Sequence, residues 1–333
     1  MTEGLMPVAA AAELIRSGRY LCIAGDEAAL RQLPTGNWIG GTIPYFMAAS
    51  GGTVSREQVF VHLVSDFATP PQLRFYDQGN LPQLCRNAPE HGYSVLIVPA
   101  FTACHSDFAR NAPNYEDMYL KPLIGWVAGT HLDELGKNTP KVVLGTSGQF
   151  SDTHAVVMDV ELPPQRYAQI GIVNLFQPGG GDNIRFTQTS FSAGSCHING
   201  VESNLADYLL GNDVDTRLPL VADYCGASIN VSIKNIERNA RYVEFYAPVF
   251  PGLDYRIATP LNAEDAALQT TRFLPDTAIT FSCNCILNFL YNELEGKQCG
   301  PLTGPMTFGE IGYQLLNQTQ VYLSIGSTAL EPD

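Results

Sequence analysis

One stretch near the C-terminus, residues 277–325, constrains the fold more than any other part of the sequence. Its apolar run over 278–283 has strand character, and the apolar residues of 286–294 then recur at the spacing of a helix. Glycine and proline interrupt the chain at 296–305, and a further apolar segment that ends in a strand pattern follows. A strand that leads directly into a helix, with a strand again after it, predicts that α and β elements are mixed.

The rest of the chain contains many short strand patterns and few helices. A continuous apolar run at 94–100 is typical of a central strand, and residues 102–111 begin a helix after it. Residues 141–146 and 154–161 have the pattern of two strands joined in a hairpin. Mixed strands with antiparallel hairpins favour an α+β fold over a doubly wound parallel sheet.

The two halves of the sequence end in a similar way, each with a helix-like segment, a glycine-rich passage and a closing hairpin. We therefore expect two related halves, residues 1–163 and 164–333, each with a mixed or antiparallel β-sheet and flanking helices. The proline-containing segment 162–167 is the expected linker. A chain of 333 residues is long enough for two domains of about 150 residues each.

The acidic balance of the sequence argues against some classes of partner. The formal net charge is -14, from 33 acidic and 19 basic residues. Binding to nucleic acid or to an anionic membrane needs clustered Lys and Arg, so neither partner is expected. No segment reaches the ~18 uninterrupted apolar residues of a membrane span, and Glu3 stands where a signal peptide needs positive charge. We expect a soluble cytoplasmic protein whose eight cysteines are mostly reduced.

Residues 34–48 crowd glycine, proline and aromatic residues together. Glycine lets a ligand approach the backbone closely, and Trp and Tyr offer flat apolar faces with one polar handle. The alternative interpretation is a tight turn followed by an aromatic strand that packs on the core. The candidate ligand-binding residues of this segment are Asn37, Trp38, Gly40, Gly41, Thr42 and Tyr45.

Two cysteine-histidine pairs, Cys104-His105 and Cys196-His197, place a thiol beside an imidazole in the sequence. Neighbouring side chains of a strand point to opposite faces, so adjacency alone is a weak sign of a catalytic pair. Cys196-His197 is the better candidate, because its Gly and Ser neighbours suggest an exposed loop. The alternative function is therefore an enzyme that depends on a thiol, a metal or haem, with Cys196, Cys283 or Cys285 as nucleophile or ligand.

The cysteines of the C-terminal stretch give no metal signature. Cys283, Cys285 and Cys299 lack the paired C-x-x-C spacing of a zinc site, so no metal is expected there. A covalent haem would need a C-x-x-C-H motif, which the sequence lacks, whereas a haem bound through histidine alone leaves no signature.

A carboxylate and two further polar residues interrupt the last apolar segment. Glu310, Asn317 and Thr319 lie in a part of the chain that is otherwise apolar enough to be interior. A buried carboxylate needs hydrogen-bond partners or a ligand. Glu310 and Asn317 are therefore candidate ligand-binding residues, and a solvent-facing edge is the alternative interpretation.

The same stretch resembles the FIST domain, a family of intracellular ligand-sensing modules with N-terminal and C-terminal parts. The resemblance is carried by Phe281-Ser282-Cys283, by the following helix, by Phe308-Gly309-Glu310-Ile311-Gly312 and by Asn317-Gln318-Thr319 before the closing strand. The segment 123–129 is similar to the small-residue turn of the family's N-terminal part. The sequence departs from the family in having no arginine after Cys283, where an anchor for an acidic ligand is common.

The resemblance implies a small-molecule sensor whose ligand lies in a pocket between two FIST-like halves. The implied contacts add Cys196, His197, Cys283, Glu310 and Asn317 to the residues of the 34–48 segment. Haem is a secondary candidate ligand, because some family members bind it, and the cofactor is otherwise unassigned. The chain has no room for an output domain, so a sensor of this kind would signal through a protein partner.

Overall fold

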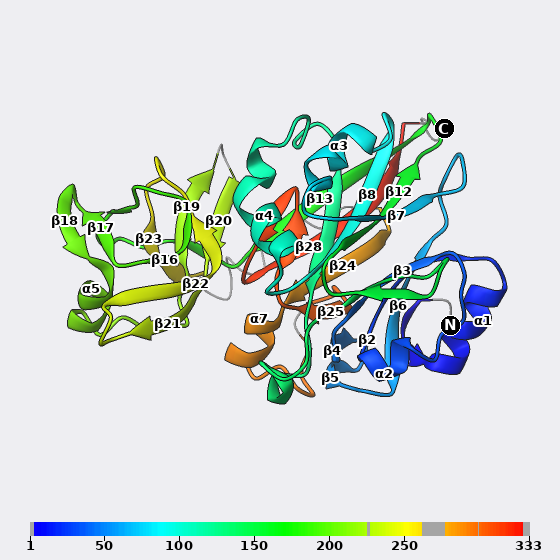
Figure 1. Cartoon of the computed structure of the whole chain (residues 1–333), viewed down its shortest axis with the longest axis horizontal. Coiled ribbons are helices and arrows are strands. Elements are labelled where there is room, and N and C mark those ends of the chain that lie inside the picture. The colour runs from blue at the N-terminus through cyan, green and yellow to red at the C-terminus, as the bar shows by residue number, and fades with distance from the viewer. Residues whose placement is uncertain (1–2, 225–226, 262–276, 299, 329–333) are drawn as a thin grey trace. The chain divides into compact units, whose positions relative to one another are not determined.

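The computed structural model describes residues 3–224, 227–261, 277–298 and 300–328 (Figure 1). Among the described residues, strand accounts for about 47% and helix for 16%, in several mixed or antiparallel sheets. The predicted α+β class is therefore confirmed. The relation between halves 1–163 and 164–333 stays a prediction.

Contacts group the described residues into two compact units. Unit 1 takes those within Met1–Ile172, Leu274–Leu315 and Gln320–Asp333, and unit 2 takes those within Val173–Phe273 and Leu316–Thr319. The C-terminal stretch that dominates the sequence thus belongs mostly to unit 1. Four of its residues belong to unit 2.

Three six-stranded sheets are built mainly from unit 1. Sheet 1 has the order β1 (Gly4–Pro7), β6 (Gln58–Val64), β2 (Tyr20–Gly25), β3 (Trp38–Thr42), β10 (Val142–Leu144) and β11 (Gln149–Ser151). Sheet 2 has the order β27 (Gln314–Leu316), β26 (Glu310–Gly312), β9 (Leu123–Ala128), β8 (Gly92–Pro99), β12 (Ala155–Glu161) and β7 (Gln72–Tyr76). Sheet 3 has the order β13 (Arg166–Asn174), β28 (Thr319–Ser327), β24 (Ile279–Cys285), β25 (Gly304–Thr307), β4 (Tyr45–Ala48) and β5 (Gly51–Val54).

The helices of unit 1 are short and pack on the sheets. They are α1 (Val8–Arg16), α2 (Glu27–Leu30), α3 (Leu84–Asn87), α4 (Ala103–Asn111) and α7 (Ile286–Tyr291), with single 3-10 turns η1 (Leu81–Gln83), η2 (Ala112–Asn114) and η3 (Leu132–Glu134). Phe108 of α4 shares a buried cluster with Leu96 and Val98 of β8, so α4 covers one face of sheet 2. Ile15 of α1 packs in the same way with Leu21 of β2 in sheet 1.

The described residues of unit 2 form three small sheets and one helix. Its strands are β14 (Phe176–Pro178), β23 (Arg256–Pro260), β19 (Leu220–Tyr224) and β20 (Ala227–Val231), then β15 (Ile184–Arg185), β17 (Ser195–Ile198) and β18 (Val201–Asn204), and then β16 (Ser190–Ala193), β22 (Tyr242–Val249) and β21 (Ile233–Glu237). The helix is α5 (Leu205–Gly211), and Asn204 caps it by accepting a hydrogen bond from Asp207 N.

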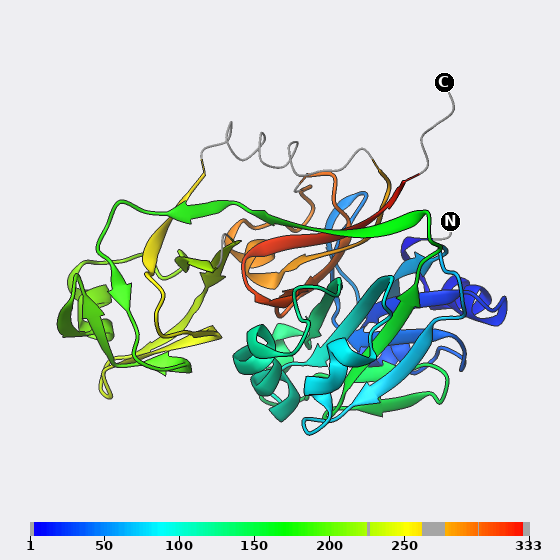
Figure 2. The same ribbon diagram turned by 90° about the horizontal axis from the view of Figure 1, so that it is seen from above.

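Sheets 1 to 3 are mixed, because each contains a parallel pair among antiparallel ones. The parallel pairs are β2–β3, β8–β9 and β24–β25. Figure 2 shows β24 and β28 side by side, and their pairing is antiparallel. The continuous apolar run at 94–100 forms β8, which lies between β9 and β12, so the predicted central strand is confirmed.

The predicted hairpin of 141–146 with 154–161 is wrong. The first segment forms β10, which pairs with β11 and with β3 in sheet 1, whereas β12 pairs with β8 and β7 in sheet 2. A third, very short strand at 149–151 turns back on β10 before β12 begins. The chain turns back at 145–148, and the strand that follows was missed because it has only three residues.

A glycine in β3 lets sheets 1 and 2 pack closely. A Cβ atom at Gly41 would lie 2.6 Å from Cγ2 of Ile97 in β8 and 2.9 Å from Nε1 of Trp126 in β9. Real Cβ atoms do not approach other atoms so closely, so these neighbours leave room only for glycine. Packing between the sheets accounts for Gly41.

Phe281 joins the three sheets of unit 1. Its ring in β24 stacks on Trp126 of β9 at 5.7 Å and lies 4.5 Å from the ring of His62 in β6. Nε2 of His62 also accepts a hydrogen bond from Ser282 N at 3.3 Å. The side chains of Phe281, Trp126 and His62, each from a different sheet, thus share one buried contact.

Within the parts of the chain that the structure describes, every helix is too short or too polar to cross a membrane.

Gly41→Ala is expected to destabilise the protein by about 1–3 kcal/mol, because the added methyl group overpacks the contact between sheets 1 and 2. Chemical denaturation measures the change. The matched control is Gly79→Ala, where the nearest atom to the new Cβ would be 3.4 Å away. Equal stability of both variants would show that the two sheets do not need a glycine at position 41.

Acid is expected to destabilise the fold through His62. Burial lowers the pKa of His62 to about 3, far below the ordinary value of 6.5. A lowered folded-state pKa means that the stabilisation is present above pH 6.5 and is lost as the pH falls towards 3, at up to about 1.4 kcal/mol per pH unit. Burial also lowers the pKa of His105, to about 4, so the wild type loses stability through both rings.

His62→Gln should therefore show a shallower fall of unfolding free energy between pH 6.5 and 4 than the wild type, as measured by urea denaturation at each pH. The exposed His91→Gln is the control, because it leaves both buried rings in place. If the unfolding free energy of His62→Gln fell with pH as steeply as that of the wild type, His62 would not be a source of the acid sensitivity.

Candidate functional site

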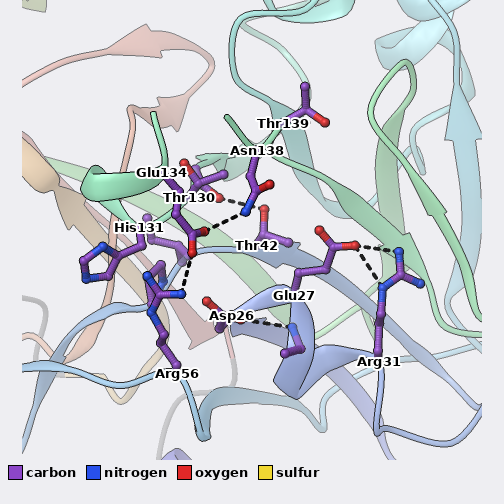
Figure 3. Close-up of a pocket in the computed structure, with 14 residues that line it drawn as sticks. Asp26, Glu27, Arg31, Thr42, Arg56, Thr130, His131, Glu134, Asn138 and Thr139 are labelled. Carbon is purple, nitrogen blue, oxygen red and sulfur yellow. Dashed lines mark hydrogen bonds and ion pairs between the residues drawn. The ribbon is translucent and has the colours of Figure 1, made fainter. Parts of the chain in front are cut away.

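A pocket of about 320 Å³ opens in unit 1 at the ends of three strands, each of which belongs to a parallel pair. Asp26 and Glu27 follow the end of β2, Thr42 ends β3, and Gly129 to His131 follow the end of β9. Figure 3 shows these groups around the pocket, with Thr42 between a cluster at Glu27 and a cluster at Glu134. Ligand sites of open α/β sheets are found at such carboxyl ends of parallel strands.

Thr42 joins the strand ends to one another. Its Oγ1 donates a hydrogen bond to Gly129 O at 2.7 Å and accepts one from Lys141 N at 2.9 Å. The backbone of Thr42 adds two more bonds, from its N to Lys141 O and from Gly129 N to its O. The end of β3 is thereby fixed to the end of β9 and to the residue before β10.

One side of the pocket carries Glu27 with two cations. Oε1 of Glu27 accepts from Nε of Arg31 at 2.9 Å, and Oε2 accepts from Nζ of Lys141 at 2.6 Å. Burial raises the pKa of Glu27, but the hydrogen bonds from Lys141 and Arg31 outweigh it, so the pKa lies below its usual value. Glu27 is therefore ionised, and both of its oxygens are occupied.

The other side carries Glu134 in η3. Its Oε1 accepts from Nη1 of Arg56 at 2.5 Å, and its Oε2 accepts from Nδ2 of Asn138 at 2.9 Å. The bonds from Arg56 and Asn138 lower the pKa of Glu134. Because this ion pair is largely exposed, solvent screens it and it holds the 131–138 loop weakly.

Thr130 differs from its neighbours because its hydroxyl has no partner. The residue lines the pocket and is 8% exposed, and among the described residues nothing hydrogen-bonds to its Oγ1. A buried hydroxyl without a partner carries a desolvation cost. A ligand in the pocket would remove that cost by supplying the missing hydrogen bond.

Tyr45 contacts the residues at the start of the loop beside the pocket. Its hydroxyl accepts a hydrogen bond from Leu132 N at 3.1 Å, and its ring stacks on the ring of His131 at 5.5 Å. Phe289 of α7 contacts the ring of Tyr45 edge-on, with the ring centroids 5.6 Å apart. These contacts fix the start of the loop that carries Glu134.

The other residues of the 34–48 prediction make contacts inside unit 1. Nδ2 of Asn37 donates to Gly18 O at 3.2 Å, and Nε1 of Trp38 donates to Pro34 O at 2.9 Å. A Cβ atom at Gly40 would lie 2.9 Å from Ile23 O. The surroundings of these residues agree with the alternative interpretation, an aromatic strand packed on the core. Of the six candidate ligand-binding residues of this segment, Thr42 lines the pocket.

Cys283 and Glu310 come close together elsewhere in unit 1. The thiol of Cys283 in β24 donates to Gly125 O at 3.3 Å, and Glu310 in β26 pairs with Trp126 of β9. Burial and the nearby Glu310 carboxylate raise the pKa of Cys283 well above its ordinary value. Glu310 is fully buried, so its expected interior position is confirmed.

Three predicted residues belong to unit 2. Asn317 is buried, and its carbonyl oxygen accepts from Nδ2 of Asn230 at 3.1 Å. Asn230 is itself paired with Asn174 through two amide bonds of 2.9 and 3.0 Å. Cys196 and His197 lie next to each other in β17, a strand and not a loop, and their side chains therefore point to opposite faces.

Several pocket residues were missed at the sequence level, namely Glu27, Arg31, Arg56, Thr130, Glu134 and Asn138. One signal could have found the first of them. The acidic pair Asp26-Glu27 directly follows a strand pattern, the position of ligand residues in parallel sheets. Arg56 and Asn138 lie in loops without any local pattern, so only the three-dimensional structure reveals them.

The described cysteines share one chemical property. Six are free and buried, and burial raises the pKa of Cys22 to about 12 and of Cys85 and Cys196 to about 11. The described part of the chain also contains no group of three or more His, Cys, Asp or Glu residues arranged to hold a metal ion. Cys299 lies outside the described residues.

These six thiols should react slowly with iodoacetamide at pH 7.5, because all six are buried and the raised pKa of five of them, all but Cys285, makes the reactive thiolate scarce. Peptide mass spectrometry after brief labelling of native protein measures each site, and urea-denatured protein gives the full extent. Fast, selective labelling of Cys196, Cys283 or Cys285 would instead favour the thiol enzyme.

The comparisons with known proteins give a family but no activity. A comparison with curated proteins finds no match. The model of a family of unknown function, DUF6976, matches residues 6–326 and so spans nearly the whole sequence. The chain therefore belongs to the family DUF6976.

Proposed function

We propose that this protein binds a small polar molecule in the pocket of unit 1 and acts as a sensory module of the FIST type. The observation that carries the proposal is the buried hydroxyl of Thr130, which has no partner among the described residues and lies in a pocket at the ends of β2, β3 and β9. The pocket volume of about 320 Å³ lies at the lower end of the ~300–1,000 Å³ range of small-molecule sites.

The pocket is largely formed before a ligand arrives. Thr42 fixes the strand ends through buried hydrogen bonds, and Tyr45 fixes the start of the loop that carries Glu134. A preformed site loses little conformational freedom on binding, which favours affinity. The exposed Arg56–Glu134 pair is the weaker tie, so the loop after His131 is the part that a ligand would restrain most.

A sensor needs a difference in affinity between two arrangements, and a partner that reads it. The loop from His131 to Asn138 is the part of the site that we propose takes two arrangements. We propose that ligand binding stabilises this loop, and that a signalling protein recognises the stabilised form. The similarity to FIST domains at Cys283 and Glu310 supports a sensory role, and those two residues would act as interior support.

Haem as the ligand and a thiol enzyme as the function have less support. Burial raises the pKa of Cys196 and Cys283, which works against a nucleophilic thiol. The space beside His62 is about 140 Å³, below the ~300 Å³ of small-molecule sites, and does not fit a haem. The larger pocket beside His131 is lined by charged side chains, which do not fit the apolar faces of a porphyrin.

Thr130→Val should separate binding from stability. The valine has the same shape without the unpartnered hydroxyl, so the ligand-free variant should be as stable as the wild type or up to about 1 kcal/mol more stable. Its affinity for a ligand should fall about fivefold or more, because a hydrogen bond to the ligand is lost.

A thermal-shift screen of metabolites identifies the ligand, since only a molecule that binds the native state raises the midpoint. Thr280→Val is the matched control, because Thr280 lines a different pocket and its hydroxyl donates to Leu323 O at 3.4 Å. A ligand that binds Thr130→Val as tightly as the wild type would place the site elsewhere.

A further inference from the structure

We infer that the ligand of this pocket is an uncharged molecule rich in hydroxyl groups, of the chemical class of a monosaccharide or cyclitol. The inference rests on the proposed function and adds the ligand class. The juxtaposition that carries it is two glutamates whose oxygens already accept hydrogen bonds from the protein's own side chains, together with a neutral hydroxyl that has no partner among the described residues.

The charges of the pocket balance without a ligand. Its carboxylates are Asp26, Glu27 and Glu134, and its cations are Arg31 and Arg56 together with Lys141, which binds Glu27 at 2.6 Å. Three negative groups therefore face three positive ones. An ionic ligand would meet no net opposite charge, and it would still lose its hydration on entry.

The oxygens of two of the three carboxylates lead to the same conclusion, while the third, Asp26, accepts a hydrogen bond from Ala28 N at 3.0 Å. Both oxygens of Glu27 accept protein hydrogen bonds, and so do both oxygens of Glu134. A cationic ligand would have to displace an arginine, the lysine or Asn138 from these carboxylates, and an anionic ligand would have to displace a glutamate. Displacing either partner would give up hydrogen bonds that the protein already supplies to these carboxylates.

The groups that remain available suit hydroxyls. Thr130 Oγ1 has no partner among the described residues. Asn138 uses its Nδ2 on Glu134, which leaves its Oδ1 as an acceptor, and a guanidinium has five N–H donors, more than Arg56 uses on Glu134. A hydroxyl group donates and accepts at once, so several hydroxyls on one ring can address these groups without bringing a charge.

The size of the pocket and the charge of the whole chain narrow the class further. A volume of about 320 Å³ suits a single ring. The net charge of -14 on the whole chain opposes the approach of phosphates and other anions to the molecule. Anions are therefore disfavoured both at the site and on the way to it.

Ligand-observed NMR on the full-length protein tests the inference with matched probes. The neutral set is hexoses, pentoses and inositols, and each charged counterpart keeps the ring but carries a phosphate, a uronate carboxylate or an amine. We expect a neutral probe to bind about tenfold or more tightly than its charged counterparts. We also expect its affinity to change less than about twofold when salt shortens the Debye length from about 30 Å to about 3 Å.

Arg56→Gln tests the charge balance directly. Loss of the guanidinium leaves one oxygen of Glu134 free, so the preference for the neutral ring over its amino derivative should shrink about fivefold. Arg86→Gln is the matched control, because Arg86 forms an exposed pair with Glu116 at 2.6 Å and does not line the pocket. A change that is only structural would weaken both probes equally.

The outcomes separate the two proposals. Binding led by a phosphate, a carboxylate or an amine, sensitive to salt and to Thr130→Val, would overturn the neutral ligand and keep the binding site. Silence of the neutral probes, of their charged counterparts and of the metabolite screen would overturn both. Neutral binding that Thr130→Val leaves unchanged would overturn the placement in this pocket.

Discussion

The buried contact between Phe281, Trp126 and His62 is the constraint on which unit 1 depends. Each ring comes from a different sheet, and the three lie far apart in the sequence. Bringing such distant segments together costs loop-closure entropy, which is repaid only when the sheets have packed. Gly41 belongs to the same region, because its missing side chain lets β3 lie against β8 and Trp126.

The pocket follows from that packing. Once sheets 1 and 2 lie face to face, the carboxyl ends of β2, β3 and β9 reach the same part of the molecule, and Thr42 locks them there. The charged residues around it are less firmly held, since their ion pairs are partly exposed. The site thus combines strand ends that buried hydrogen bonds hold firmly with charged side chains that are held less firmly.

Local patterns in the sequence were sufficient to predict the central strand, the helix after it and the α+β class. The interior position of Glu310 was also predictable, because the apolar residues of its segment are buried and carry the carboxylate into the interior with them. Pairing over long distances was not predictable. Whether β10 pairs with β3 or with β12 depends on packing of the sheets, and so does the use of Gly41. Most of the pocket was missed because residues such as Arg56 and Asn138 lie in loops without a distinctive pattern, although the acidic pair after β2 was a readable signal.

The turn at Asn317 and Gln318 has a consequence for the order in which the protein is made. Residues 316–319 complete unit 2, where Asn317 O meets Asn230, and Gln318 accepts from Ser232 Oγ at 2.6 Å and donates to Arg217 O at 3.0 Å. The remainder of unit 2 is encoded before residue 274. During translation, Asn230 and Ser232 must therefore stay hydrated or find temporary partners until residues 316–319 have been made. Unit 2 is for this reason a poor candidate for expression as one continuous fragment.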